Sequence, residues 1–325
     1  MTKLYITIDT EYSFGQARKH PAGTRQENFD RSIRCTTSEG EVGIHYQMDV
    51  LERHGLKGVF FVDPMPALLW GVGAIADIVR PIVARGHDVQ LHIHTEWLAL
   101  AGNATPLGAR VGNNLSDFNF EDQCWLLDYG RSVLMAAGAP APVAFRAGNY
   151  AANDDTLRAL ARVGLHFDTS HVPGISGSDC SISLGPKNRD PQMHCGVIEV
   201  PAGCISGFRG QLRHAQLAAI SASEIFAALR HATSSDTESF TLVSHSFELL
   251  SRDRRRINHM IRRRFEKLCA GIADMRGVLT TTYASDPPSA SEKRRESSVL
   301  PPDWLRTSLR MVEQAFGNAL YGGRA

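Results

Sequence analysis

Short runs of apolar residues alternate along the chain with longer segments in which apolar residues recur at helical spacing. The first apolar runs lie at residues 3–9, 56–63 and 88–94, and helical spacing appears at 41–54 and 75–85. Run 56–63 is apolar almost throughout, which is typical of a strand buried on both faces of a parallel sheet. The pattern therefore predicts strand, helix, strand, helix, strand at the start of the chain.

The same alternation continues to residue 283. Helices are predicted at 121–137, 154–163, 222–232 and 257–273, and strands at 142–145, 166–169, 240–248 (followed by a loop within that range) and 278–283. Repeated alternation with short connections favours a parallel α/β sheet or barrel over separate helical and sheet domains. In such folds, catalytic side chains lie where the strands end.

Two segments interrupt this alternation. Residues 15–40 are polar and lack clear periodicity, and they are longer than most loops of compact domains, so we expect a lid there. Residues 171–214 are rich in Gly, Ser and Pro and contain one predicted strand, at 196–203. We expect this second segment to be an elaborated loop that forms part of the substrate wall.

The composition changes after residue 285. The segment DPPSASEKRRESSVLPPDW is polar and contains prolines, and residues 305–320 have the spacing of a short amphipathic helix. The sequence therefore predicts a catalytic domain over 1–284, followed by a linker and a C-terminal helix over 285–325.

The overall composition is that of a globular chain with ample core. The chain has 325 residues, 43% of them apolar, and a net charge of +1, so neither disorder nor a polyanionic partner is indicated. Residues 251–268 carry seven arginines, which we interpret as the solvated face of a helix. Their position after His245 would also suit a phosphate or an anionic glycan near the cleft. Aromatic residues are not interleaved with these cations, so we expect no nucleic-acid partner.

The chain shows no feature of export or membrane insertion. Its N-terminus runs directly into a predicted strand, without a charged leader or an apolar stretch of signal-peptide length. No apolar run is long enough for a membrane span. We therefore expect a cytoplasmic protein whose six cysteines, which lack CxxC spacing, are reduced thiols.

Two histidines and two carboxylates form the candidate chemistry. His92 and His94 are two residues apart, so a continued strand would place them on one face. Asp9 and Glu11 lie two apart at the end of the first strand. Two imidazoles with one carboxylate are a known catalytic zinc pattern, so we predict a divalent metal, with zinc preferred, held by Glu11, His92 and His94. Asp9 would be the base beside a water activated by that metal.

Two further side chains follow predicted strands and fit this chemistry. Arg146 in FRAGNY, placed near Asp9, would keep that carboxylate ionised and oriented. His245 in LVSHSFE would protonate a leaving amine, with Glu248 available to orient it. An arginine or a histidine after a strand more often has a structural role. A catalytic role is favoured here only because Arg146 and His245 occur together with Asp9 at predicted strand ends.

The ordered motifs TIDTE, GHDVQLHIHTEW, FRAGNY and LVSH resemble those of the polysaccharide deacetylase family. This family consists of metal-dependent hydrolases that remove acetyl groups from N-acetylated amino sugars. The resemblance covers residues 3–283 and implies an α/β fold, a distorted (β/α) barrel with fewer than eight strands, which agrees with the alternation described above.

The resemblance also implies roles for individual residues. It implies Asp9 as the base, with Arg146 as its partner, and His245 as the general acid. Glu11 and His92 are implied as metal ligands. Backbone N–H near Tyr150 is implied in oxyanion stabilisation, and we expect Tyr150 and Trp97 to contact the substrate.

This sequence departs from the family pattern at the metal site. The family commonly has two adjacent Asp residues in its first motif, where this chain has Asp9 and Glu11. Its second metal histidine commonly stands four residues after the first, where this chain has Glu96. We assign His94 because it shares a strand face with His92. Glu96 remains the alternative, and a helical turn starting at His92 would favour it.

The sequence thus predicts a metal-dependent hydrolase that removes acetyl from an N-acetylated amino sugar of a polysaccharide or glycan precursor. Because no export signal is visible, a precursor or lipid-linked glycan is the preferred substrate. The alternatives are a cyclic amide hydrolase with the same machinery and an inactive glycan-binding relative. The sequence leaves the oligomeric state open.

Overall fold

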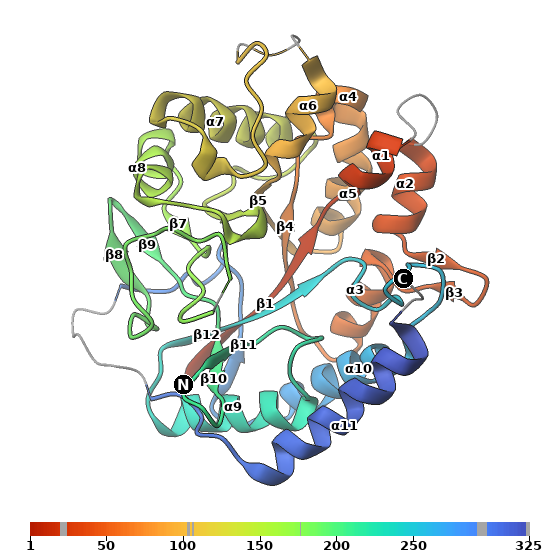
Figure 1. Cartoon of the computed structure of the whole chain (residues 1–325), viewed down its shortest axis with the longest axis vertical. Helices are drawn as coiled ribbons and strands as arrows, with labels where there is room; N and C mark the ends of the chain where they lie inside the picture. Colours follow the sequence, from red (N-terminus) through yellow and green to blue (C-terminus); the bar gives the residue numbers. More distant parts are fainter. Residues whose placement is uncertain (20–24, 103–104, 106, 176, 291–297, 323–325) are drawn as a thin grey trace.

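The computed structural model describes residues 1–19, 25–102, 105, 107–175, 177–290 and 298–322, and a curled, mostly parallel sheet lies at its centre (Figure 1). The strand order is β12-β1-β4-β5-β6-β7-β9-β8, and β13 pairs with β1. The strands are β1 (Thr2–Thr10), β4 (Val59–Val62), β5 (Asp88–Ile93), β6 (Ala144–Ala147), β7 (Phe167–Asp168), β8 (Gln192–His194), β9 (Val197–Glu199), β12 (Ser239–His245) and β13 (Val278–Thr280).

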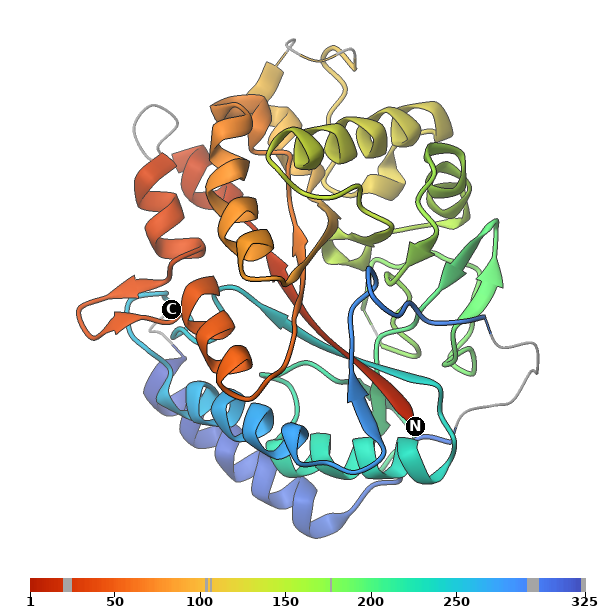
Figure 2. The same cartoon turned by 180° about the vertical axis from the view of Figure 1, so that it is seen from behind.

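Helices cover the outer side of this sheet, as the view from behind shows (Figure 2). They are α1 (Phe14–Lys19), α2 (Arg25–Ser32), α3 (Ile44–Arg53), α4 (Ala67–Trp70), α5 (Val72–Ala84), α6 (Leu98–Ala101), α7 (Phe120–Ala136), α8 (Asp154–Val163), α9 (Ala222–Ser234), α10 (His259–Ala273) and α11 (Trp304–Tyr321). Short 3₁₀ turns are η1 (Thr95–Trp97), η3 (Leu115–Asp117) and η4 (Gly148–Tyr150). Two small antiparallel pairs, β2 (Thr36–Thr37) with β3 (Gly40–Glu41) and β10 (Cys204–Ser206) with β11 (Leu212–His214), complete the described elements.

The expected distorted (β/α) barrel is confirmed. Strands β12, β1, β4, β5, β6, β7 and β9 run parallel in succession. Antiparallel β8 and the short β13 bring the sheet to nine strands in the part of the chain that the structure describes. The expected number below eight thus holds for these seven successive strands and is exceeded by the whole sheet, in which β13 is also parallel.

Alternation along the strands separates an outer apolar face from an inner face that becomes polar. Leu4, Ile6 and Ile8 of β1 are buried in the large core cluster that includes the helices. Tyr5, in contrast, belongs to a smaller buried cluster inside the curl, with Phe61 among its members. Fully burying one such side chain contributes about 1.5–3 kcal/mol, so the outer face stabilises the fold. The inner face is left free to carry functional groups.

Residues 15–40 were expected to form a polar loop, and this expectation is wrong. The described residues form α1, α2 and the β2–β3 pair instead. Helix α2 is anchored by a polar side chain, because Asn28 is fully buried and exchanges two hydrogen bonds of 2.8 Å with the backbone of Ser13. No apolar stripe marks such a helix in the sequence. Residues 20–24 of the expected lid lie outside the described residues, and the lid itself stays a prediction.

The segment at 171–214 also holds more structure than the sequence predicted. The one expected strand is β9, and β8, β10 and β11 are additional. Each of the three additional strands has three residues, which is too short to produce a recognisable alternation. Residue 176 lies outside the described part of this segment.

The C-terminal segment remains in contact with the rest of the chain. Asp286, just past the predicted boundary, accepts a hydrogen bond of 2.7 Å from Lys3, and its backbone oxygen accepts one of 2.7 Å from Tyr5. The predicted helix at 305–320 is present as α11 and contacts α9. Part of the predicted linker, residues 291–297, lies outside the described residues.

None of the helices in the described part of the chain combines the length and the apolar character that crossing a bilayer requires. The six cysteines are all free, as expected from their spacing.

Candidate active site

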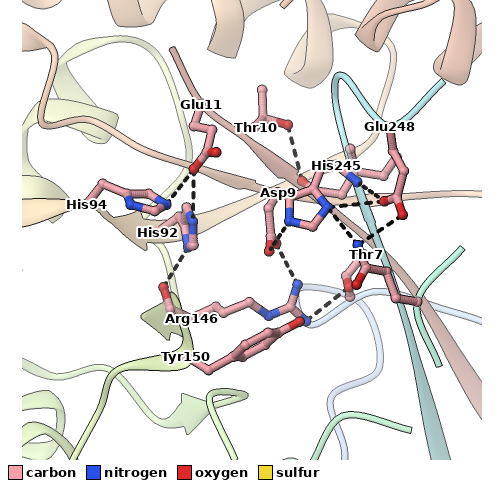
Figure 3. A network of polar contacts seen from close by, with 12 residues as sticks. Thr7, Asp9, Thr10, Glu11, His92, His94, Arg146, Tyr150, His245 and Glu248 are labelled. Atoms are coloured by element: carbon pink, nitrogen blue, oxygen red, sulfur yellow. Dashed lines mark hydrogen bonds and ion pairs between the residues drawn. The ribbon is translucent and has the colours of Figure 1, made fainter. Parts of the chain in front are cut away.

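Four strand ends bring the predicted functional residues together on the inner face of the curl. The register of the parallel pairs places Asp9 beside His245 and His92 beside Arg146. Figure 3 shows Asp9 between two groups, with Glu11, His92 and His94 on one side and His245 on the other. Sequence positions up to 236 residues apart thus share one site because their strands are neighbours.

Glu11, His92 and His94 form a cluster able to hold a metal ion. Glu11 Oε2 lies 2.5 Å from His94 Nε2 and 3.6 Å from His92 Nε2. One potential ligand atom from each residue lies within 4.8 Å of those of the other two. The donor set, two imidazoles and a carboxylate, fits catalytic zinc. The structure therefore brings together the three residues predicted as ligands.

The outer nitrogen of each histidine is held by a second group. His92 Nδ1 lies 2.8 Å from the backbone oxygen of Arg146, and His94 Nδ1 lies 3.2 Å from Glu96 Oε2. Such contacts orient metal-binding histidines in proteins. Glu96 thus lies on the far side of the His94 ring, outside the ligand group. Gly148 leaves the space for this ring, because a Cβ there would come within 2.7 Å of His94 Nδ1.

Glu11 and His94 form a charged pair. Burial alone would raise the pKa of Glu11, but the charge of His94 and hydrogen bonds from both histidines hold this pKa well below its usual value. Burial would likewise lower the pKa of His94, and the charge of Glu11 raises it well above its usual value. The cluster therefore contains a half-buried carboxylate beside imidazole nitrogens, and a metal ion would bind in place of the proton that His94 carries in this pair.

Arg146 holds Asp9 as predicted. Its Nη1 lies 2.5 Å from Asp9 Oδ1, its Nη2 donates to the hydroxyl of Thr7 at 3.0 Å, and its guanidinium lies 4.5 Å from the centroid of the Phe61 ring. Burial alone would raise the pKa of Asp9, but Arg146, followed by His92 and His245, keeps it below its usual value. Asp9 is therefore ionised at neutral pH and fixed in place, as a general base must be.

His245 and Glu248 form the opposite side of the site. His245 Nδ1 lies 3.1 Å from Glu248 Oε2, and His245 Nε2 lies 3.9 Å from Asp9 Oδ2. Burial would lower the pKa of His245, but the hydrogen bond and charge of Glu248, together with Asp9, raise it to about 9. His245 is thus protonated at neutral pH and can donate a proton.

The two predicted substrate contacts have different outcomes. The Tyr150 hydroxyl lies 3.1 Å from His214 Nε2, and Figure 3 shows the Tyr150 ring beside Arg146. Trp97 is only 1% exposed and packs edge-on against Phe14 and Trp70. The prediction that Trp97 contacts the substrate is therefore wrong, because η1 turns its indole into the core.

Sequence reasoning missed three residues around the site. Gln216 donates to Glu248 Oε1 at 3.0 Å and thereby helps to hold the carboxylate that orients His245. His214 faces Tyr150, and burial lowers its pKa to about 4, so it is neutral. Asp63 accepts from the backbone N–H of His94 at 3.4 Å, and burial raises its pKa to about 7. Asp63 directly follows the apolar run of β4, just as Asp9 lies at the end of β1, so its position in the sequence could have identified it as a candidate site residue.

A second group of potential metal ligands lies elsewhere in the described chain. Asp154, His194 and Cys195 have ligand atoms within 4.8 Å of one another, and His194 Nε2 lies 3.1 Å from Asp154 Oδ1. Asp154 Oδ1 and Oδ2 also accept hydrogen bonds from the backbone and hydroxyl of Ser183. These hydrogen bonds account for the carboxylate without a metal.

Two solved structures have a similar fold. A candidate polysaccharide deacetylase from Mycobacterium smegmatis aligns with 90% of this chain and 94% of its own length, at a TM-score of 0.56 and 16% identity. A 4-α-glucanotransferase from Thermococcus litoralis aligns with 89% of this chain and 41% of its own, at a TM-score of 0.53 and 13% identity. No family model matches the chain, and no curated protein matches it. At this identity the likenesses show a polysaccharide deacetylase-like fold, and the choice of reaction depends on the site.

Proposed function

We propose that this protein is a metal-dependent hydrolase that removes the acetyl group from an N-acetylated amino sugar of a polysaccharide or glycan precursor. The observation that carries the proposal is the convergence of three units at one set of strand ends. These units are the Glu11, His92 and His94 cluster, the Asp9–Arg146 pair and the His245–Glu248 pair. The fold shared with a candidate polysaccharide deacetylase supports the same reaction.

Glu11, His92 and His94 would hold the divalent ion, and zinc suits this donor set. When bound, such an ion supplies Lewis-acid activation of water and of the acetyl carbonyl. The remaining steps belong to the chain's own residues.

Asp9 and His245 would move the two protons of the hydrolysis. Arg146 occupies Asp9 Oδ1, so Oδ2 is the oxygen left to take a proton from the attacking water. The water oxygen bonds to the acetyl carbon while the carbon–nitrogen bond breaks. His245 Nε2 gives its proton to the leaving nitrogen as that bond breaks, because Glu248 holds the other ring nitrogen. The products are acetate and a free amino sugar.

Hydrolysis of a cyclic amide would use the same groups, and the product distinguishes the two reactions. Free acetate indicates deacetylation, whereas ring opening releases no acetate. A purely glycan-binding role would need neither an ionised, clamped Asp9 nor a protonated His245. The cytoplasmic location expected from the sequence stays a prediction.

The test combines metal analysis with acetate release from N-acetylhexosamine oligomers. We expect about one zinc per chain after reconstitution, and acetate release that a chelator abolishes. Asp9→Asn should lower kcat by at least ~100-fold, because it removes the base. Asp128→Asn, an exposed aspartate on α7, is the matched control and should retain activity. Absence of bound metal, or full activity of Asp9→Asn, would refute the proposal.

A further inference from the structure

A basic cavity of about 750 Å³ begins two residues beyond Glu11, where Ser13 lines it. Its other lining residues come from α1, from α2, from β2 and from the loop that follows β12. Five cations line it, together with a single carboxylate: Arg18, Lys19, Arg31, Arg254, Arg255 and Asp253. Such an excess of cations in a concave site raises the local concentration of anions.

One aromatic ring connects this cavity to the general acid. The Phe247 ring stacks on the His245 ring, with 5.3 Å between the ring centroids. The Arg254 guanidinium also contacts Phe247, at 3.8 Å from its ring centroid. Arg254 also donates to the Ser32 hydroxyl at 3.1 Å. A group bound in the cavity would therefore lie next to a sugar bound at His245.

Most cations of this cavity form no ion pair with a described carboxylate, although Arg254 feels the charge of Glu11 and Arg255 that of Asp253. In the described part of the chain, Arg18, Lys19, Arg254 and Arg255 form no ion pair, whereas Arg31 pairs with Glu27. Asp253 is engaged by its own loop, because its Oδ1 accepts from Ser251 and from the backbone of Arg255. Gln16 adds a buried Nε2 that has no hydrogen-bond partner among the described residues.

We propose that this cavity binds a phosphate or diphosphate group carried by the amino-sugar substrate. A ligand with a single carboxylate would need fewer than the four cations that form no ion pair here. Guanidinium groups bind phosphate in a bidentate manner, so a phosphate or diphosphate fits this set better. The inference rests on the proposed deacetylation and narrows its substrate to a phosphorylated glycan precursor. The carrier of the phosphate is either a nucleoside or a prenyl lipid.

Calorimetry with inorganic pyrophosphate tests the cavity without requiring turnover. The double variant Arg18→Gln/Arg255→Gln should bind pyrophosphate at least ~10-fold more weakly than the natural chain. Arg209→Gln, an exposed cation in the turn between β10 and β11, is the control and should bind as the natural chain does. Chelation of a bound metal by pyrophosphate would affect all of these proteins equally. Equal affinity of the double variant, or no binding by the natural chain, would overturn the proposal.

Substrate comparison supplies the second readout. The ratio of kcat/KM for UDP-N-acetylglucosamine, or for prenyl-diphosphate N-acetylglucosamine, to that for a neutral N-acetylglucosamine oligomer should fall ~10-fold in the double variant. Preference for either phosphorylated substrate supports the site and identifies the carrier. Preference for the neutral oligomer would refute it while leaving deacetylation intact.

The C-terminal helix carries an independent inference, because its polar side faces the protein. Helix α11 lies along the outer side of the molecule near α9 and α10 (Figure 1). Arg310 pairs with Glu224 at 3.1 Å, and both side chains are buried. Glu313 pairs with Arg264 at 2.7 Å, and the Gln314 side chain donates a hydrogen bond to the backbone oxygen of Ala219. An amphipathic helix of a monomer normally buries its apolar side instead.

The apolar side of α11 is exposed to solvent. Its large apolar side chains are between 54% and 75% exposed: Trp304, Leu305, Leu309, Met311, Val312, Phe316 and Leu320. With ~150–250 Å² for each aromatic side chain and less for the others, they offer on the order of 700 Å². The largest apolar patch of a typical monomer is ~300–600 Å². A standard protein–protein interface buries ~800 Å² per partner, so this face has the area of a dimer contact.

The exposed face is also complementary to itself. Leu305, Leu309, Val312 and Phe316 follow the alternating spacing of four and three residues by which paired helices interlock. Small residues run beside them at Ser308, Ala315 and Ala319, which leaves a groove next to the ridge. None of the exposed residues of this face is charged, so two copies would meet without repulsion.

We infer that the apolar face of α11 pairs with the same face of a second copy of this chain. A two-fold axis would let the ridge of each helix enter the groove of the other. Light scattering coupled to size exclusion, at micromolar concentrations of the full chain, should then give a dimer. Leu309→Glu/Phe316→Glu should give a monomer with an unchanged circular dichroism spectrum. Met135→Glu, which places the same charge at an exposed apolar position of α7, should remain dimeric.

A milder variant keeps this inference falsifiable if the double variant fails to fold. Phe316→Ala should weaken dimerisation by at least ~10-fold in sedimentation velocity. A monomeric natural chain, or a dimer that these substitutions leave unchanged, would overturn the inference. Binding of the monomer to phosphatidylglycerol vesicles that Leu309→Glu/Phe316→Glu abolishes would assign the face to a membrane, and would equally overturn it.

Discussion

Replacing Arg146 by Met tests whether this cation exists to hold Asp9. The side chain of Arg146 is fully buried and that of Asp9 is 5% exposed, with 2.5 Å between Nη1 and Oδ1. Arg146→Met leaves a buried carboxylate without its partner, whereas Asp9→Asn leaves a buried guanidinium. Breaking a buried pair from one side costs about 3–5 kcal/mol in the free energy of unfolding.

The double variant Arg146→Met/Asp9→Asn should recover much of this loss. It removes both charges, so the losses that remain are the hydrogen bonds from Arg146 to Thr7 and to the backbone oxygen of Thr169 and the contact with the Phe61 ring, at about 1 kcal/mol each. We therefore expect the double variant to be destabilised by about 3 kcal/mol, and we expect a coupling energy of at least ~3 kcal/mol between the two substitutions. Thr7→Val is the control, because it removes the hydroxyl contact without touching the charges.

Urea unfolding at several pH values is the assay. The pKa of Asp9 is lowered in the folded protein, so its pairing stabilises the fold fully above the usual carboxyl pKa of about 4. This stability is lost as the pH falls through the lowered pKa. The difference between the natural chain and Arg146→Met should therefore shrink below pH ~4. Additive single effects, or a difference that does not change with pH, would refute the reasoning.

Three further predictions concern the acid and the metal ligands. Glu248→Gln should lower the pKa of His245 from about 9, because Glu248 is the main group that raises it. The alkaline limb of the profile of kcat/KM against pH should then move down by at least ~1 pH unit. An unmoved limb would exclude His245 as the acid. Glu96→Gln should weaken zinc affinity ~10–100-fold in a chelator competition without removing the site, and complete loss of zinc would instead make Glu96 a ligand. Gly148→Ala should displace His94 and weaken zinc binding at least ~10-fold, since the added Cβ overlaps the ring, and unchanged zinc affinity would contradict the described packing.

Elements with strong periodicity were predictable from the sequence. The apolar run of β4 and the helix at 154–163, which the structure reproduces as α8, follow directly from their patterns. Asn153 caps that helix by accepting from the backbone N–H of Thr156, and Gly164 ends it in the left-handed region at φ 79°. These local signals agree with the tertiary contacts, so the elements could be placed with little error.

Elements held by polar contacts were not predictable. Helix α2 depends on Asn28 and its exchange with Ser13, which no hydrophobic pattern reveals. Gln216 reaches the site because its backbone bridges to Val243 of β12, a contact between irregular chain and a strand. The orientation of Trp97 depends on the turn η1, which begins only after His94. The spacing of His92 and His94 in the sequence was enough to predict that they form a pair. The residues that surround this pair depend on the tertiary structure and could not be predicted.

Anomalous diffraction from zinc-soaked crystals at the zinc edge tests the central claim most directly. We predict one strong peak bonded to Glu11, His92 and His94 at ~2.0–2.2 Å, with Asp9 beside it and outside its ligand shell. A protein without a peak there, or with its peak at Asp154, His194 and Cys195, would contradict the account.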